Sequence, residues 1–134
     1  MNFLDRMQPL GLLVLRLALG AVMIAHGYQK VFGGMQHFQQ VLHGLGIPTW
    51  MAYLAAAAEF GGGILVVVGF LTRFAAFAIL IDMLVAITKV HLHHGLVGPM
   101  GLEFPMGMAA IAFSLIFAGA GPISIDWLRG GRSR

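Results

Sequence analysis

The chain contains no cysteine, and only 10% of its 134 residues are charged. The absence of cysteine excludes disulfides, thiolate metal ligands and iron–sulfur clusters carried by this chain alone. The shortage of charge is matched by a hydrophobic share of 59%. A soluble domain of this length could not bury so much apolar surface, so part of it must face lipid. No glycine motif follows a strand-like run, which leaves nucleotide binding without support.

The formal net charge of +3 is small and comes mostly from the ends of apolar segments. This pattern is typical of membrane topology and not of a nucleic-acid surface, so no nucleic-acid partner is expected. The first apolar run ends near Ala25 and could be mistaken for a signal peptide. Because Arg16 interrupts it and the run exceeds a usual signal core, we interpret it as a retained membrane helix.

Four apolar segments have roughly the 20 residues needed to cross the hydrocarbon layer of a bilayer. They lie at residues 10–31, 50–70, 73–90 and 104–120. The sequence therefore predicts an all-α fold, an integral membrane four-helix bundle that forms a single domain over residues 1–134. Glycines separate the segments, and Thr72 is placed to cap the third one at its N-terminus.

The connection between the first two segments has a helical pattern of its own. Its apolar residues recur at helical spacing at Met35, Phe38, Val41, Leu42 and Leu45. Glutamines and histidines fill most of the other positions, which predicts a short amphipathic helix lying at the membrane interface. A second short interfacial helix is predicted after Pro122, with Ser124 as its cap.

Basic residues are distributed unevenly between the two ends of the predicted helices. Lys30 and Lys89 lie at one end, and the arginines lie at the other: Arg6, Arg16, Arg73, Arg129, Arg132 and Arg134. The positive-inside rule then places both termini in the cytoplasm. Tyr28 and Trp50 fall at the outer interface and Trp127 at the inner one, as an aromatic belt requires.

Small residues form a stripe on the second helix and another on the fourth. The second helix presents Ala52, Ala55, Ala56, Gly62 and Gly63, and the fourth presents Gly107, Ala110, Ser114, Ala118 and Gly121. Small residues let helices approach closely in lipid, where packing drives association. The pattern therefore predicts that the second and fourth helices are close-packing partners.

Five ionisable residues interrupt stretches that otherwise suit lipid: Arg16, His26, Glu59, Asp82 and Lys89. A charge at the bilayer centre costs at least about 2.5–3.5 kcal/mol, so such residues pair with one another or line a polar path. Glu59 and Asp82 lie too deep to reach the headgroups. They are either ion-paired for structural reasons or part of a binding or proton site, and with His26 they are the predicted catalytic residues.

The remaining basic side chains are candidate binding residues. Arg16, Lys30, Lys89 and His91 are predicted to contact a substrate. The alternative is that Arg16 and the two lysines extend their charged ends to the nearer headgroups. Arg73 begins a predicted helix and is interpreted as an orientation charge.

Histidines also gather after the third helix. His91, His93 and His94, with Glu103, contain metal-ligand chemistry. Their spacing matches no tight ligand motif, so a hydrated and pH-responsive loop is the favoured interpretation and no metal site is predicted. A haem between His26 and a histidine of the third helix is conceivable but disfavoured.

The order of several short motifs resembles the DoxX family. The first helix carries LRLALG at residues 15–20 and HGYQK at 26–30. The second carries AEFGG at residues 58–62, and its turn carries GFLTR at 69–73. The residues that match the family pattern are Arg16, His26, Lys30, Glu59 and Arg73.

The resemblance implies a four-helix, multi-pass protein of bacterial or archaeal inner membranes. The wider family includes a subunit of a thiosulfate:quinone oxidoreductase and partners of membrane complexes linked to oxidative stress. By that analogy the chain is expected to work near the quinone pool. Its expected partners are the lipid bilayer and other membrane redox subunits, and a homo-oligomer is a further alternative. Membership of a family constrains the fold better than it constrains the function.

Three functions compete at this stage. The first is a redox-associated subunit in which a quinone lies among His26, Glu59, Asp82 and Lys89, with electrons from a partner. The second is a non-catalytic accessory or assembly subunit of a larger membrane complex. The third is a small transporter or proton pathway, against which stands the absence of an inverted repeat between the two halves.

Overall fold

The computed structural model describes residues 2–91, 95–98 and 101–130, apart from the side chains of Val90 and His91. Within these ranges the chain is all-α, with no strand. Three of the helical pieces carry the label η; η2 and η3 are wider π-type turns, and η1 contains a kink between two helices. In chain order the elements are α1 (Asn2–Arg6), α2 (Gln8–Gln29), η1 (Lys30–Gly34), α3 (Met35–Gly44), α4 (Met51–Ala56), η2 (Ala57–Gly61), α5 (Gly62–Val68), α6 (Thr72–Ala86), η3 (Ile87–His91), α7 (Glu103–Ala118) and α8 (Ile125–Leu128).

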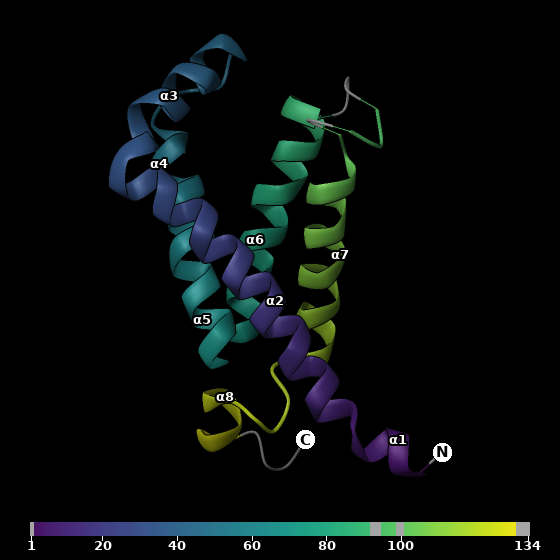
Figure 1. Ribbon diagram of the computed structural model, residues 1–134. Coiled ribbons are helices and arrows are strands. Elements are labelled where there is room, and N and C mark those ends of the chain that lie inside the picture. Colours follow the sequence, from purple (N-terminus) through teal and green to yellow (C-terminus); the bar gives the residue numbers. More distant parts are fainter. Residues whose placement is uncertain (1, 92–94, 99–100, 131–134) are drawn as a thin grey trace.

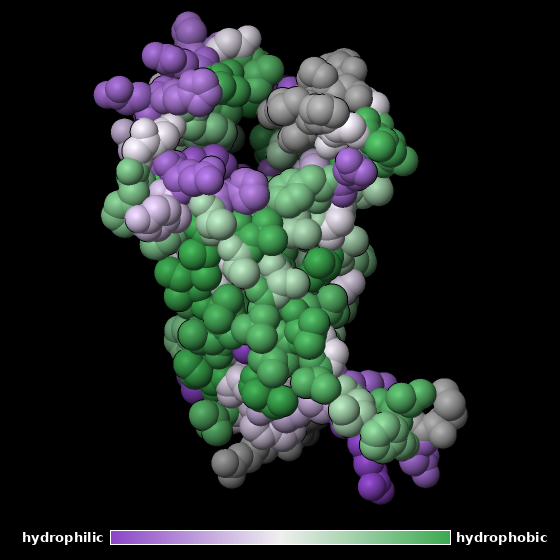
Figure 2. Space-filling model, in the orientation of Figure 1, coloured by the Kyte–Doolittle hydropathy of each residue, from purple (hydrophilic) through white to green (hydrophobic). Residues whose placement is uncertain are grey.

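Among the described residues, two helices are long and apolar enough to cross a membrane, Gln8–Gly44 and Met51–Val68. The shorter helix Glu103–Ala118 is also apolar. Hydrophobic residues cover the middle of the molecule, while hydrophilic ones gather at its two ends and above all on α3 (Figure 2). Both chain termini lie at the end opposite α3 (Figure 1). This distribution of apolar surface fits a protein that is surrounded by lipid.

The observed helices begin and end close to the predicted positions, for local reasons. Gly69 takes a left-handed φ of 73° and ends α5, which suits glycine because it carries no Cβ. Ser124 caps α8 as predicted, since its hydroxyl accepts from the amide of Trp127 at 3.2 Å. The predicted cap of α6 is wrong: Thr72 is the first residue of the helix, and its hydroxyl has no hydrogen-bond partner.

Asp126 supplies the cap that Thr72 does not. Its carboxylate accepts from the backbone amides of Leu71 at 2.8 Å and Thr72 at 2.9 Å. These are among the amides that a helix leaves unpaired at its N-terminus. The backbone amide of Asp126 in turn donates to the carbonyl of Gly69 at 2.8 Å. The short helix α8 is thereby fixed under the α5–α6 turn.

Glycines set the crossing of α2 with η2 and α5. A Cβ added to Gly20 would lie 2.8 Å from the carbonyl oxygen of Gly63, and one added to Gly27 would lie 2.4 Å from the amide nitrogen of Phe60. Both distances are shorter than real Cβ contacts. Close approach of backbones through small residues is a common way to join helices in lipid. Within the glycine stripe of the second predicted helix, Gly63 therefore faces the first helix, whereas Gly62 faces Ile79 of α6.

The predicted pairing of the second and fourth helices is wrong. The main partner of α7 is α6, and the two run side by side (Figure 1). Their shared core is apolar, with Ala75, Ala76 and Ile79 on α6 and Ala112 and Leu115 on α7, each almost fully buried. Alanine on both helices allows the approach that the small-residue pattern suggested, but with a different partner.

The α2 helix bends before it continues into α3. Phe32 (φ −107°, ψ 25°) and Gly33 (ψ −19°, φ 160°) depart from helical values, so the chain changes direction there. On α3, Leu42 is buried and Phe38 half-buried, whereas His37, Gln40 and His43 are exposed. The position of α3 at the interface stays a prediction.

Candidate functional site

A cavity of about 720 Å³ lies between α3 and α4 on one side and α6 on the other. We call it the main cavity. Most of its wall is apolar, with side chains such as Leu42, Met51, Leu65 and Met83. The polar groups on its wall are His26, Lys30, Glu59 and Asp82. An apolar cavity with a few convergent polar groups is the usual form of a small-molecule site.

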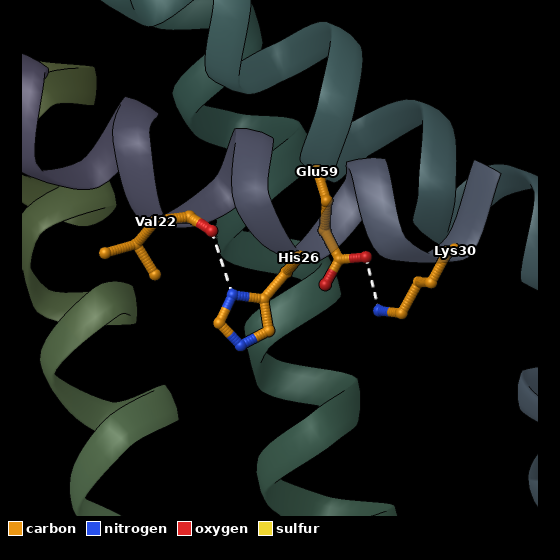
Figure 3. A network of polar contacts seen from close by, with 4 residues as sticks. All are labelled: Val22, His26, Lys30 and Glu59. Atoms are coloured by element: carbon orange, nitrogen blue, oxygen red, sulfur yellow. Dashed lines mark hydrogen bonds and ion pairs between the residues drawn. The ribbon is translucent and has the colours of Figure 1, made fainter. Parts of the chain in front are cut away.

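Lys30 and Glu59 form an ion pair at this wall (Figure 3). The side chain of Glu59 is 4% exposed and that of Lys30 19%. The Lys30 ammonium also lies 4.2 Å from the ring centroid of Phe38, in cation–π geometry. Lys30 therefore turns inward to the site and does not extend to the headgroups. Phe38 is not among the predicted site residues, because in the sequence it belongs only to an amphipathic helical pattern.

The backbone is locally widened where Glu59 enters the cavity. Glu59 lies in η2, a single π-type turn between α4 and α5. Such turns inside α-helices occur frequently at functional sites, because they displace one residue from the regular ladder. Its partner Lys30 begins η1, the segment in which the helix kinks at Phe32 and Gly33. The periodicity of the sequence did not predict this irregular helical geometry.

Asp82 joins the pair from α6. Its half-buried carboxyl group lines the cavity together with Lys30 and Glu59, and the charges of the three groups interact. We call Lys30, Glu59 and Asp82 the charged cluster. With both carboxyls ionised it holds one negative charge in excess, and one bound proton makes it neutral. A low-dielectric wall favours such neutrality.

His26 lies on α2, one helical turn before Lys30. Its Nδ1 is 2.9 Å from the carbonyl oxygen of Val22 (Figure 3). A carbonyl only accepts, so Nδ1 carries the hydrogen and Nε2 is left to interact with a ligand. The ring stacks on Phe104, with centroids 5.1 Å apart. His26 is exposed and lines the cavity, which suits contact with a bound molecule.

Arg16 lies apart from these residues, near the α5–α6 turn. It is 1% exposed and neither lines the main cavity nor extends to the headgroups. Its guanidinium donates to the carbonyl oxygens of Val66 at 2.9 Å, Val67 at 2.8 Å, Ala120 at 3.0 Å and Ile123 at 2.6 Å. Four of its five N–H groups are therefore used to tie α5 to the α7–α8 connection.

Of the remaining predicted binding residues, the structure describes the side chain of Lys89 but not that of His91. Lys89 is exposed in η3 and does not line the main cavity. The side chain of His91 and all of His93 and His94 lie outside the described residues. Among the residues that the structure does describe, no three His, Asp or Glu side chains are grouped to hold a metal ion.

The main cavity is bordered by side chains that face outward from the molecule. Leu54 is 57% exposed, Ile81 48% and Phe74 69%, and all three line the cavity. They belong to the apolar middle of the chain. An apolar molecule dissolved in lipid would therefore meet apolar side chains along its whole path to the charged cluster.

Residues 11–92 match the DoxX family. The chain is 32% identical over 106 residues to the Bacillus subtilis protein named "Putative oxidoreductase CatD", an alignment that covers 79% of this chain and 78% of CatD. It is 36% identical to the uncharacterized membrane protein Rv3486 of Mycobacterium tuberculosis, over 92% of this chain and 78% of that one. The inner membrane protein YqjF of Escherichia coli is 34% identical over 54% of this chain and 55% of its own length.

No solved structure matches the chain. The family assignment therefore stands on the sequence match, which includes Arg16, His26, Lys30 and Glu59 and also Asp82. The apolar middle and the two membrane-length helices agree with relatives that are named as membrane proteins. The chain is a membrane protein of the DoxX family.

Proposed function

We propose that this chain is a redox-associated membrane subunit that binds a quinone in its main cavity. The observation that carries the proposal is the combination of a cavity of about 720 Å³, mostly apolar, with the charged cluster and His26 on one wall. A quinone has the same division of character, with an apolar ring and tail and two polar carbonyl oxygens. CatD, a relative named as an oxidoreductase, supports a redox role.

The polar wall offers what quinone chemistry needs. Reduction of a quinone to a quinol takes two electrons and two protons, and each carbonyl oxygen first needs a hydrogen-bond donor. Lys30 and a protonated His26 are donors, while the Glu59–Asp82 pair can bind and release a proton beside them. In this proposal the electrons come from a partner protein; the cysteine-free sequence excludes an iron–sulfur cluster in this chain as their source.

We further propose an arrangement in the membrane. The α2 helix, the α4–α5 helix, α6 and α7 form a four-helix bundle in a bacterial or archaeal inner membrane. The described arginines lie toward the end where both termini are found, so that end faces the cytoplasm by the positive-inside rule. The main cavity and the charged cluster then lie in the outer half of the bilayer, with α3 over them.

Quinone retention by the purified protein tests the proposal. The protein is extracted gently from its own membranes, and bound quinone is measured by mass spectrometry. Ala78→Phe narrows the cavity that Ala78 lines, whereas Ala110→Phe adds the same ring to an exposed position on α7. We expect at least a roughly tenfold loss of quinone from Ala78→Phe, equivalent to about 1.4 kcal/mol. Ala110→Phe should retain the wild-type content.

A second measurement separates binding from proton handling. Glu59→Gln keeps the size of the side chain but removes its charge. We expect this variant to lower quinol-linked electron transfer in native membranes while the protein still accumulates. Wild-type protein without quinone, together with unchanged activity of Glu59→Gln, would contradict the proposal and favour an accessory role.

A further inference from the structure

A second cavity lies at the end of the molecule where the chain termini are found. Its volume is about 690 Å³, and it is formed by the start of α6, the residues that follow α7, and α8. We call it the basic cavity and define it by Thr72, Arg73, Asp126, Trp127 and Arg129. It shares Phe74 with the main cavity but contains none of the charged cluster.

The charges around the basic cavity do not balance. Arg73 and Arg129 oppose one carboxylate, that of Asp126. This carboxylate is already engaged, because it accepts from the backbone amides of Leu71 and Thr72 and lies within electrostatic range of Arg16. Two arginines therefore face the cavity with no carboxylate left to neutralise them among the residues that the structure describes.

Each arginine is held by contacts that leave its charge available. The guanidinium of Arg73 lies against the backbone of Gly119, where an added Cβ would be 3.1 Å from Nη2. The guanidinium of Arg129 lies 5.0 Å from the ring centroid of Phe70. Arg73 is also the second residue of α6, where the helix dipole disfavours a cation. An anion in the cavity would remove that disadvantage.

Thr72 gives an independent indication of a ligand. The residue is 1% exposed and lines the basic cavity. Its buried hydroxyl has no hydrogen-bond partner among the described residues. Buried polar groups are almost always hydrogen-bonded, and an unpaired one is costly. A bound group with acceptor oxygens would satisfy it.

The surroundings indicate a lipid as the source of the anion. Phe74 lines the basic cavity and is exposed, and α6 and α7 carry two further exposed rings, those of Phe77 and Phe117. Trp127 lines it, and tryptophan prefers the level of the headgroups. Basic pockets between membrane helices bind the headgroups of anionic lipids. A phosphate here would have acyl chains along the exposed α6–α7 face.

We propose that the basic cavity binds the phosphate group of an anionic phospholipid. Arg73 and Arg129 contact the phosphate oxygens, Thr72 donates its hydroxyl to one of them, and the acyl chains lie against α6 and α7. The inference is independent of the proposed quinone site, which uses other residues.

Lipid retention by single variants tests the assignment. The full chain is placed in nanodiscs of phosphatidylcholine with a minor share of phosphatidylglycerol, then released for native mass spectrometry. We expect wild-type protein to retain phosphatidylglycerol over phosphatidylcholine. Arg73→Gln and Arg129→Gln should each lower this preference roughly fivefold, about the effect of one basic residue near an anionic surface. Arg6→Gln, on the exposed α1, is the matched control and should keep it.

Two further arms keep the test decisive. Thr72→Val preserves side-chain shape and removes only the hydroxyl, so it should lower the preference without lowering thermal stability. Inorganic phosphate, titrated in neutral detergent without phospholipid, distinguishes a lipid from a free anion. Tight binding of inorganic phosphate with no lipid preference would overturn the assignment to a lipid. An equal loss of the phosphatidylglycerol preference in Arg6→Gln would also overturn the assignment. The attraction of anionic lipid would then come from the positive charge of this whole end of the molecule and not from the basic cavity.

Discussion

Glu59, in the π-type turn η2, forms an ion pair with Lys30, which lies just before the kink at Phe32 and Gly33, at the only polar wall described for an otherwise apolar cavity. Each partner alone would be a costly charge in an apolar wall. As a pair, the two charges neutralise each other. Asp82 and His26 are further polar groups on the same wall. The pair is thus both a structural contact and the edge of the candidate site.

Lys30→Met should destabilise the protein, because it leaves Glu59 as a buried carboxylate without its cation. We expect the free energy of unfolding in mixed micelles to fall by about 3 kcal/mol, a typical cost of breaking a buried pair. The double variant Lys30→Met, Glu59→Met should recover part of that loss, since no charge is then stranded. Lys89→Met is the matched control, as Lys89 is exposed. A double variant less stable than Lys30→Met would contradict this account of the pair.

Gly27→Ala should weaken the crossing of α2 with η2. The new Cβ would lie 2.4 Å from the backbone nitrogen of Phe60, which cannot move without shifting a helix. Overpacking of this kind costs about 1–3 kcal/mol. Gly11→Ala in the same helix meets nothing within 4 Å, so it should be neutral or slightly stabilising. Thermal unfolding of both variants in one detergent compares them, and equal midpoints would count against the close crossing.

The membrane class could be predicted from the sequence because long apolar segments report directly on the solvent that surrounds them. The ends of helices were predictable at Gly69 and Ser124, where local chemistry decides the conformation. The same reasoning failed at Thr72, because its competitor Asp126 lies 54 residues away in the chain. A contact between residues so far apart in the chain cannot be predicted from the sequence around Thr72.

Helix pairing and the fate of each charge were harder to predict. A stripe of small residues shows that a helix is approached closely but not by which neighbour, so Gly63 was assigned to the wrong partner. In the sequence, Arg16 and Lys30 were similar candidates for binding, since both are basic residues of the first predicted helix. The structure places Arg16 on four backbone carbonyls and Lys30 on Glu59. Only the packed chain shows which charges share a cavity.

Arg16→Lys should destabilise the protein while the folded fraction keeps its quinone. A lysine ammonium is a point donor and cannot reach the four carbonyls that the planar guanidinium joins. With each stranded buried acceptor costing about 1–3 kcal/mol, a loss of at least about 2 kcal/mol is expected. Arg6→Lys on the exposed α1 should have no effect. A stable Arg16→Lys variant that loses quinone would instead support a direct binding role for Arg16.

Asp126→Ala and Thr72→Val distinguish the two candidate caps of α6. The Asp126 carboxylate accepts from both amides at the start of the helix, whereas the Thr72 hydroxyl accepts from neither. Removing a capping side chain costs about 0.5–2 kcal/mol, and here the variant also releases α8 from the α5–α6 turn. We therefore expect Asp126→Ala to lower the unfolding midpoint clearly and Thr72→Val to leave it unchanged. Asp5→Ala, an exposed carboxylate on α1, controls for lost charge at this end. The reverse order, with Thr72→Val the more damaging change, would restore the cap that the local sequence suggested.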